Sequence, residues 1–164
     1  MTNTDLDRPT ALRGIAPDVA RLLAEQGELE ARKIALRPAN KEVLFDGLLH
    51  AGIAYVTVSF DGAGDSGQIE DVDARNLKDE SVPMPPAQIV LAGIDWQSKE
   101  AVERRLSLEQ AIEEMVYDFL SDTHGGWENN DGAYGEFCFD ARARTIHLDH
   151  NERFTSSELY THDF

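Results

Sequence analysis

The spacing of apolar side chains switches from alternating to helical along the chain, and this switch restricts the fold more than any other feature. From Ile53 to Phe60, apolar and polar residues alternate, which is the two-residue period of a strand with one buried face. Over residues 108–121 apolar residues recur every three or four positions, which is the period of a helix with one buried stripe. A chain that joins these patterns without a regular strand–helix repeat is typical of an α+β domain.

Three helices are expected around this pattern. Pro17 suits a first helical position, and the helix that it begins should end at Pro38. A second helix should cover residues 41–50 with Asn40 as its N-cap. The third is the central amphipathic helix, and the Ser-x-x-Gln run that starts at Ser107 has the form of a capping box. These helices should pack on an antiparallel sheet.

That sheet is expected to consist of two β-hairpins. In the first, residues 53–60 pair with residues 68–73 across a long glycine-rich loop at 61–67. In the second, residues 136–139 pair with residues 145–150. The other expectations concern shorter segments: a short strand at 88–92, helical character around 99–105 and an edge strand within 155–164.

Composition favours one soluble domain. The 164 residues, 41% of them hydrophobic, suffice for a single core, so we expect a flexible lead at 1–14 and a single domain at 15–164. No apolar run is long enough to cross a bilayer, and the polar N-terminus does not resemble a secretory signal. The lone Cys138 is expected to be a packed strand residue, and it fits a reducing cytoplasm.

The charge of the chain is unevenly distributed. Residues 1–60 contain 8 acids and 7 bases, whereas residues 61–164 contain 23 acids and 8 bases, a net charge of −15. Such a surface repels phosphates, so we expect no direct binding to nucleic acid. It favours a basic protein partner or divalent cations, although a merely soluble acidic surface has the same composition.

Two acidic loops contain the residues that are the strongest candidates for a binding site or a catalytic site. The loop at 61–67 is rich in glycine and aspartate, and the stretch "GWENNDGAYGEF" at 126–137 mixes turn formers, acids and two aromatics. Its aromatic residues are expected either to form a ligand platform or to pin the loop to the core. The candidate binding surface comprises Asp61, Asp65, Glu70, Trp127, Glu128, Asp131, Tyr134, Glu136 and Asp149.

A divalent cation is the alternative use of these acids. Flexible, oxygen-rich loops can hold Mg²⁺ or Ca²⁺, for stability or for hydrolysis. The ligands in that alternative are Asp61, Asp65, Glu70, Glu128, Asp131 and Glu136. The histidines lack a metal-binding spacing such as His-Glu-x-x-His, so we expect surface or hydrogen-bonded structural roles for them. If both hairpins lie in one sheet, Glu70, Glu136 and Asp149 should meet on its open face.

Two segments together, "SFDGAGDSGQIED" at 59–71 and "GWENNDGAYGEFCFDARARTIHLDHNERF" at 126–154, resemble an uncharacterised family of small acidic bacterial proteins. Its members occur on plasmids, integrative elements and phages and are grouped as a domain of unknown function. The resemblance implies no reaction, cofactor or catalytic residue. It implies an accessory or anti-defence role, since mobile elements often encode such proteins.

Signatures of a nucleophile, a general base and a metal site are all incomplete, so a non-catalytic role without a cofactor is expected. The sequence therefore favours an acidic binding protein, active in the cytoplasm, that covers a basic nucleic-acid-binding surface of a host or defence protein. The alternative is a metal-binding domain or metal-dependent hydrolase that uses the loop carboxylates.

Overall fold

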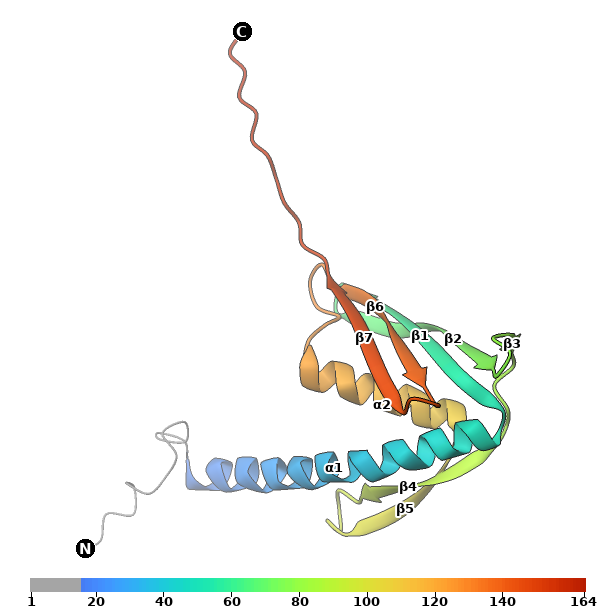
Figure 1. Cartoon of the computed structure of the whole chain (residues 1–164). Coiled ribbons are helices and arrows are strands. Elements are labelled where there is room, and N and C mark those ends of the chain that lie inside the picture. The colour runs from blue at the N-terminus through green and yellow to red at the C-terminus, as the bar shows by residue number, and fades with distance from the viewer. Residues whose placement is uncertain (1–15) are drawn as a thin grey trace, which may run out of the picture. The chain divides into compact units, whose positions relative to one another are not determined.

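The computed structural model describes residues 16–164, and these residues group into two compact units (Figure 1). The larger unit comprises Asn40–Leu91 and Arg105–Phe164. The smaller comprises the described residues up to Ala39 and residues Ala92–Arg104. The lead expected at 1–14 lies outside the described residues. No helix in the described part of the chain is long and apolar enough to span a bilayer.

Helix α1 is continuous from Pro17 to His50, so the predicted helix end at Pro38 is wrong. Proline removes one N–H from the hydrogen-bond ladder, and the flanking segments are rich in strong helix formers that offset this loss. The boundary between the two units falls directly after this interruption, between Ala39 and Asn40. Beyond it, the helix contributes three fully buried side chains to the core: Leu44, Phe45 and Leu48.

The larger unit contains a five-stranded antiparallel sheet with the order β3-β2-β1-β6-β7. The predicted hairpins are β1–β2 and β6–β7, and they join through β1 and β6. The α+β class and the antiparallel sheet are therefore confirmed. The strands are β1 Ile53–Ala63, β2 Ser66–Asn76, β3 Ser81–Val82, β6 Ala133–Asp140 and β7 Thr145–Glu152.

The connection between β1 and β2 is a two-residue turn, so the long loop predicted at 61–67 is wrong. Gly64 and Asp65 have φ angles of 59° and 68°, both in the left-handed region that a type I′ hairpin turn requires. The strand ladder continues to the edge of this turn, where Ala63 pairs with Ser66. The glycines on either side thus belong to strands.

Helix α2, Leu108–Thr123, begins at the predicted capping box. The backbone N–H of Gln110 donates to Ser107 Oγ at 3.1 Å, and the backbone N–H of Ser107 donates to Gln110 Oε1 at 3.0 Å. The buried face of α2 belongs to the same core as the inward face of the sheet. That shared core includes Ile112, Val116, Val56, Val58, Phe137 and Phe139.

A second, two-stranded sheet contains β4, Gln88–Ile94, and β5, Ala101–Ser107. The strand predicted at 88–92 is confirmed, whereas the helical character predicted around 99–105 is wrong. Charged residues in that run have good helix propensity, but pairing with β4 overrides this weak local preference. Residues 155–164 are exposed and form no strand, so the predicted edge strand is also wrong.

Candidate functional site

The two faces of the five-stranded sheet differ in chemistry. On the central strand β1, Val56, Val58 and Phe60 are buried, as the alternation predicted. The side chains between them point to the opposite face, where β2, β6 and β7 contribute mostly polar and charged residues. We call this side the acidic sheet face. Its carboxylates are Asp61, Asp71, Asp73, Glu136, Asp140 and Asp149.

One row of this face places acids beside one another. Ser59 pairs with Asp71 on one side and with Glu136 on the other, and Glu136 pairs with Asp149. Directly opposed residues of antiparallel strands project from the same face, so Glu136 and Asp149 lie side by side. Their predicted meeting is therefore present. Asp71 occupies the place expected for Glu70, because a register shift after Ser59 moves β2 by one residue.

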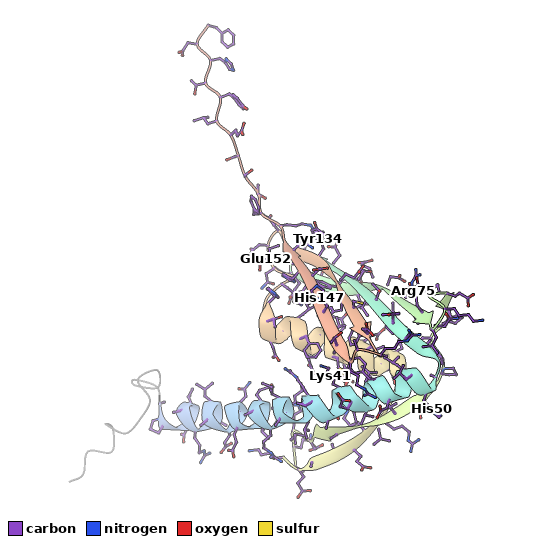
Figure 2. The ribbon with its side chains drawn as sticks, viewed as in Figure 1. Lys41, His50, Arg75, Tyr134, His147 and Glu152 are labelled. Atoms are coloured by element: carbon purple, nitrogen blue, oxygen red, sulfur yellow. The ribbon has the colours of Figure 1, made fainter. Side chains whose placement is uncertain are left out.

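Several acids of this face have hydrogen-bond or ion-pair partners among the side chains of the chain. Arg153 contacts both carboxylate oxygens of Asp61, at 3.0 and 2.9 Å, and these bonds lower the pKa of that carboxyl. Arg75 lies 2.9 Å from Asp73, and on β7 the imidazole of His147 lies 3.1 Å from the Asp149 carboxylate (Figure 2).

Two acids of the row have no such compensation. Within residues 16–164, the side chains of Asp71 and Glu136 have neither a hydrogen bond nor an ion pair. Both are exposed. The face therefore presents uncompensated negative charge to solvent.

The two acidic loops meet at one end of the sheet. The N–H of Gly64 donates to the carbonyl of Asn130, and the N–H of Asp65 donates to the carbonyl of Glu128, both at 3.0 Å. Within the second loop, Asn130 and Gly132 take φ angles of 58° and 78°. These hydrogen bonds between the loops are made by their backbones, whereas the side chain of Asp65 is exposed and that of Glu128 is half-buried.

Trp127 pins the second loop to the core, one of the two roles expected for it. Its ring meets Phe60 edge-on, with the centroids 5.4 Å apart. It also covers the backbone of Gly62 and Gly67, where an added Cβ would lie 2.6 and 2.3 Å from the ring. The glycines of the first hairpin therefore make room for an indole. They do not form a ligand cradle.

The remaining loop candidates also have partners in the chain. Thr155 donates its hydroxyl to Asp131 Oδ2 at 2.9 Å. The guanidinium of Arg153 lies over the ring of Tyr134, 4.7 Å from its centroid. Glu70 accepts a hydrogen bond from Gln68 at 3.0 Å and lies outside the row described above.

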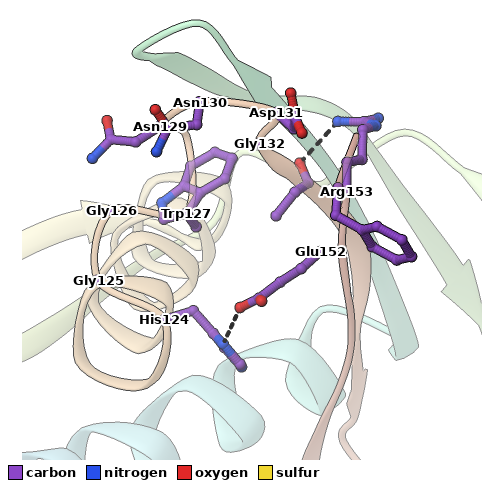
Figure 3. A pocket seen from close by; sticks show the side chains of 12 residues that line it. His124, Gly125, Gly126, Trp127, Asn129, Asn130, Asp131, Gly132, Glu152 and Arg153 are labelled. Atoms are coloured by element: carbon purple, nitrogen blue, oxygen red, sulfur yellow. Dashed lines mark hydrogen bonds and ion pairs between the residues drawn. The ribbon is translucent and has the colours of Figure 1, made fainter. Parts of the chain in front are cut away.

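A pocket of about 270 Å³ lies beside these loops (Figure 3). Its walls are the end of α2, the loop at 125–132 and the end of β7. Asp131 and Arg153 lie on one side of it, and His124 and Glu152 lie on the other. Sequence reasoning about the two loops predicted neither this pocket nor the histidine in it.

One group of three potential metal-ligating side chains occurs among residues 16–164. It comprises His124, His150 and Glu152, whose ligand atoms lie within 4.8 Å of one another. The six loop carboxylates proposed from the sequence form no group of this kind in the same part of the chain. Neither ring nitrogen of His150 has a hydrogen-bond partner among the described residues, so the expectation of a surface or hydrogen-bonded structural role is wrong for it.

Cys138 lies on β6 between the acids of the sheet face and is partly buried. Burial raises the pKa of its thiol, and the charges of Asp140 and Glu136 raise it further. A nucleophilic cysteine requires the opposite shift. The thiol therefore has the inert character expected of a structural residue.

The fold and the sheet face define an acidic α+β domain. The chain belongs to DUF6878, a family of unknown function, whose sequence model matches residues 36–164. The match includes the whole of both predicted hairpins and begins inside α1. No curated protein and no solved structure matches the chain significantly.

Proposed function

We propose that this domain is a non-catalytic binding protein whose acidic sheet face docks on a basic, nucleic-acid-binding surface of another protein. The observation that carries the proposal is the exposed row in which Glu136 lies directly opposite Asp149, with Asp71 in line. Like charges directly opposite one another destabilise a sheet. A cationic partner would remove that cost on binding.

Charge complementarity defines the partner. The sheet places carboxylates on adjacent strands about 5 Å apart, and lysine and arginine side chains that contact a phosphate backbone can contact such carboxylates instead. Attraction of this kind accelerates association and weakens as salt is added. The chain itself, with a net charge of −16, should not bind nucleic acid.

The setting follows from the resemblance to small acidic proteins of plasmids, integrative elements and phages. On this proposal, the target is a DNA-binding host or defence protein in the cytoplasm. Occupation of its DNA-binding surface would block it without any catalytic step.

The test compares two variants of equal charge. The face variant combines Asp71→Asn, Glu136→Gln and Asp149→Asn. The control variant combines substitutions of three exposed acids elsewhere in the chain: Glu28→Gln, Glu103→Gln and Glu109→Gln. A protein captured from the host by the wild type is purified, and its dissociation constant for each variant is measured at two salt concentrations.

The proposal predicts that the face variant binds at least tenfold more weakly, that the control variant binds like the wild type, and that duplex DNA competes with the domain. Equal weakening in both variants would mean that binding depends on the net charge of the domain and not on the acidic sheet face. A complex that holds DNA and the domain at the same time would exclude occupation of the DNA-binding surface.

A second candidate is a Mg²⁺ or Ca²⁺ site at the junction of the two loops, because their backbones meet there. Asp65, which is exposed, and Glu128, which is half-buried, are its available oxygen donors, whereas Asp61 and Asp131 would have to leave Arg153 and Thr155. Thermal melts of EDTA-treated protein with each ion at matched ionic strength test this candidate. An ion-specific rise in Tm that Asp65→Asn removes would support it, and identical melts would reject it.

A further inference from the structure

The end of α2 and the end of β7 bring two imidazoles and a carboxylate together. His124 is the C-cap residue of α2, and its ring stacks on that of His150, with centroids 3.6 Å apart and planes 8° apart. Glu152 Oε1 lies 3.7 Å from Nδ1 of His124 and 3.8 Å from Nε2 of His150. One carboxylate oxygen thus lies within reach of both rings.

His150 is the unusual member of this group. Its side chain is only 6% exposed, and within residues 16–164 neither ring nitrogen has a hydrogen-bond partner. Buried polar atoms nearly always have partners, so an imidazole with two free nitrogens calls for a ligand.

We propose that His124, His150 and Glu152 bind a divalent transition-metal ion of the Zn²⁺ type. Two imidazole nitrogens and one carboxylate oxygen suit Zn²⁺ and its neighbours in the transition series, whereas Mg²⁺ and Ca²⁺ require mainly oxygen ligands. Three protein ligands leave one position of a tetrahedral ion open. His124 and Glu152 line the pocket, so that open position is accessible to water from it.

The stacked rings determine how the ion enters. Lone pairs of imidazole lie in the ring plane, so two parallel rings cannot direct both of theirs at one ion. The ring of His124 must therefore turn. Its side chain is 34% exposed and follows the last turn of α2, whereas His150 is held between that ring and Phe60, whose centroid lies 5.8 Å away. Metal binding is thus expected to separate the two rings.

This site is independent of the function proposed above. On β7, His147 and Asp149 point to the acidic sheet face, and His150 points to the core side. His147 consequently offers a matched control: it is a histidine of the same strand, next to a carboxylate at 3.1 Å, but on the opposite face.

The experiment measures binding of Zn²⁺ by calorimetry, and of Co²⁺ by its visible absorption, on protein purified without a polyhistidine tag. The ligand variants are His124→Ala, at a half-buried position, and Glu152→Gln, at an exposed one, so that neither removes a side chain of the core. The control variant is His147→Ala. Far-ultraviolet circular dichroism checks that each variant is folded.

We expect one ion per chain, absorption by Co²⁺ at the intensity of a tetrahedral site, and a rise in Tm with Zn²⁺. Each ligand variant should weaken Zn²⁺ binding at least tenfold, and His147→Ala should leave it unchanged. Absence of binding by the wild type would overturn the proposal. Weakening by His147→Ala equal to that by His124→Ala would also overturn it, because the ion would then bind surface histidines without preference.

Discussion

The opposition of Glu136 and Asp149 predicts that replacing one of them with a cation stabilises the protein. The two residues pair directly on adjacent strands, which places their side chains about 5 Å apart. Two unit charges at that distance in water interact by about 0.8 kcal/mol, and screening in about 0.1 M salt reduces this to roughly 0.5 kcal/mol. Glu136→Lys converts the repulsion into an attraction, so we expect a gain of about 1 kcal/mol in the free energy of unfolding.

A double-mutant cycle isolates this pair from its surroundings. Glu136→Lys is compared in the wild type and in the Asp149→Asn background, and the difference is the coupling energy. Unfolding is followed in urea, which is uncharged and therefore leaves the ionic strength to be set by the added salt. The coupling should shrink to about 0.3 kcal/mol in about 1 M salt, where the Debye length is only about 3 Å.

Two results would refute this reasoning. A coupling energy near zero in about 0.1 M salt would mean that the two carboxylates do not interact. A coupling that persists undiminished in about 1 M salt would mean that packing, not charge, links the two positions. Either result would mean that Glu136 and Asp149 do not repel each other measurably. The argument that a cationic partner relieves this repulsion would then lose its basis.

Three further predictions concern other parts of the larger unit. Gly132→Ala should lower the free energy of unfolding, measured by urea titration, by about 2–5 kcal/mol, because φ is +78° and an added Cβ would lie 1.7 Å from a carbonyl oxygen. Gly64→Ala is the control: its φ is also positive but an added Cβ would meet open space, so it should lower the free energy of unfolding by only about 1–2 kcal/mol. The Cys138 thiol should react with iodoacetamide more slowly in the folded protein than in urea, since burial and neighbouring carboxylates raise its pKa; equal rates would contradict this. A hydrogen bond from Ser81 lowers the pKa of Asp73 below its unfolded value, so this carboxylate stabilises the fold above about pH 4 and ceases to do so as acid protonates it. The difference in stability between the wild type and Asp73→Asn should therefore shrink below that pH, and a constant difference down to about pH 2 would contradict the assignment.

Local signals account for the part of the fold that could be predicted. The alternation in β1 and the capping box of α2 each involve residues close together in sequence, and both appear in the structure. The expectations that failed depended on distant partners. Residues 99–105 have adequate helix propensity, but β4 is available to pair with them, and Pro38 is accommodated because the helix after it has a core to join.

Only part of the two proposed sites could be predicted from the sequence. Glu136 and Asp149 could be placed together from alternation and hairpin pairing alone. The presence of Asp71, and not Glu70, in this row could not be predicted. Glu70 is left unpaired by a bulge of β2 opposite Ser59 and Phe60, and such a bulge leaves no local signal in the composition of either strand. His124 and His150 come from a helix end and a strand that are far apart in the sequence, and no spacing rule brings such residues together.

Strand β7 carries residues of both proposed sites, and its period of two keeps them separate. Asp149 belongs to the acidic sheet face, while the next residue, His150, points to the core side and the stacked rings. A shift of one residue in the pairing with β6 would exchange these faces, burying a carboxylate and exposing the imidazole. Such a shift is opposed by Ile146 and Leu148, which pack against the core from the same side as His150. The register that completes the core therefore also determines which surface receives the acids and which receives the histidine, so neither site could be moved along β7 without loss of the other.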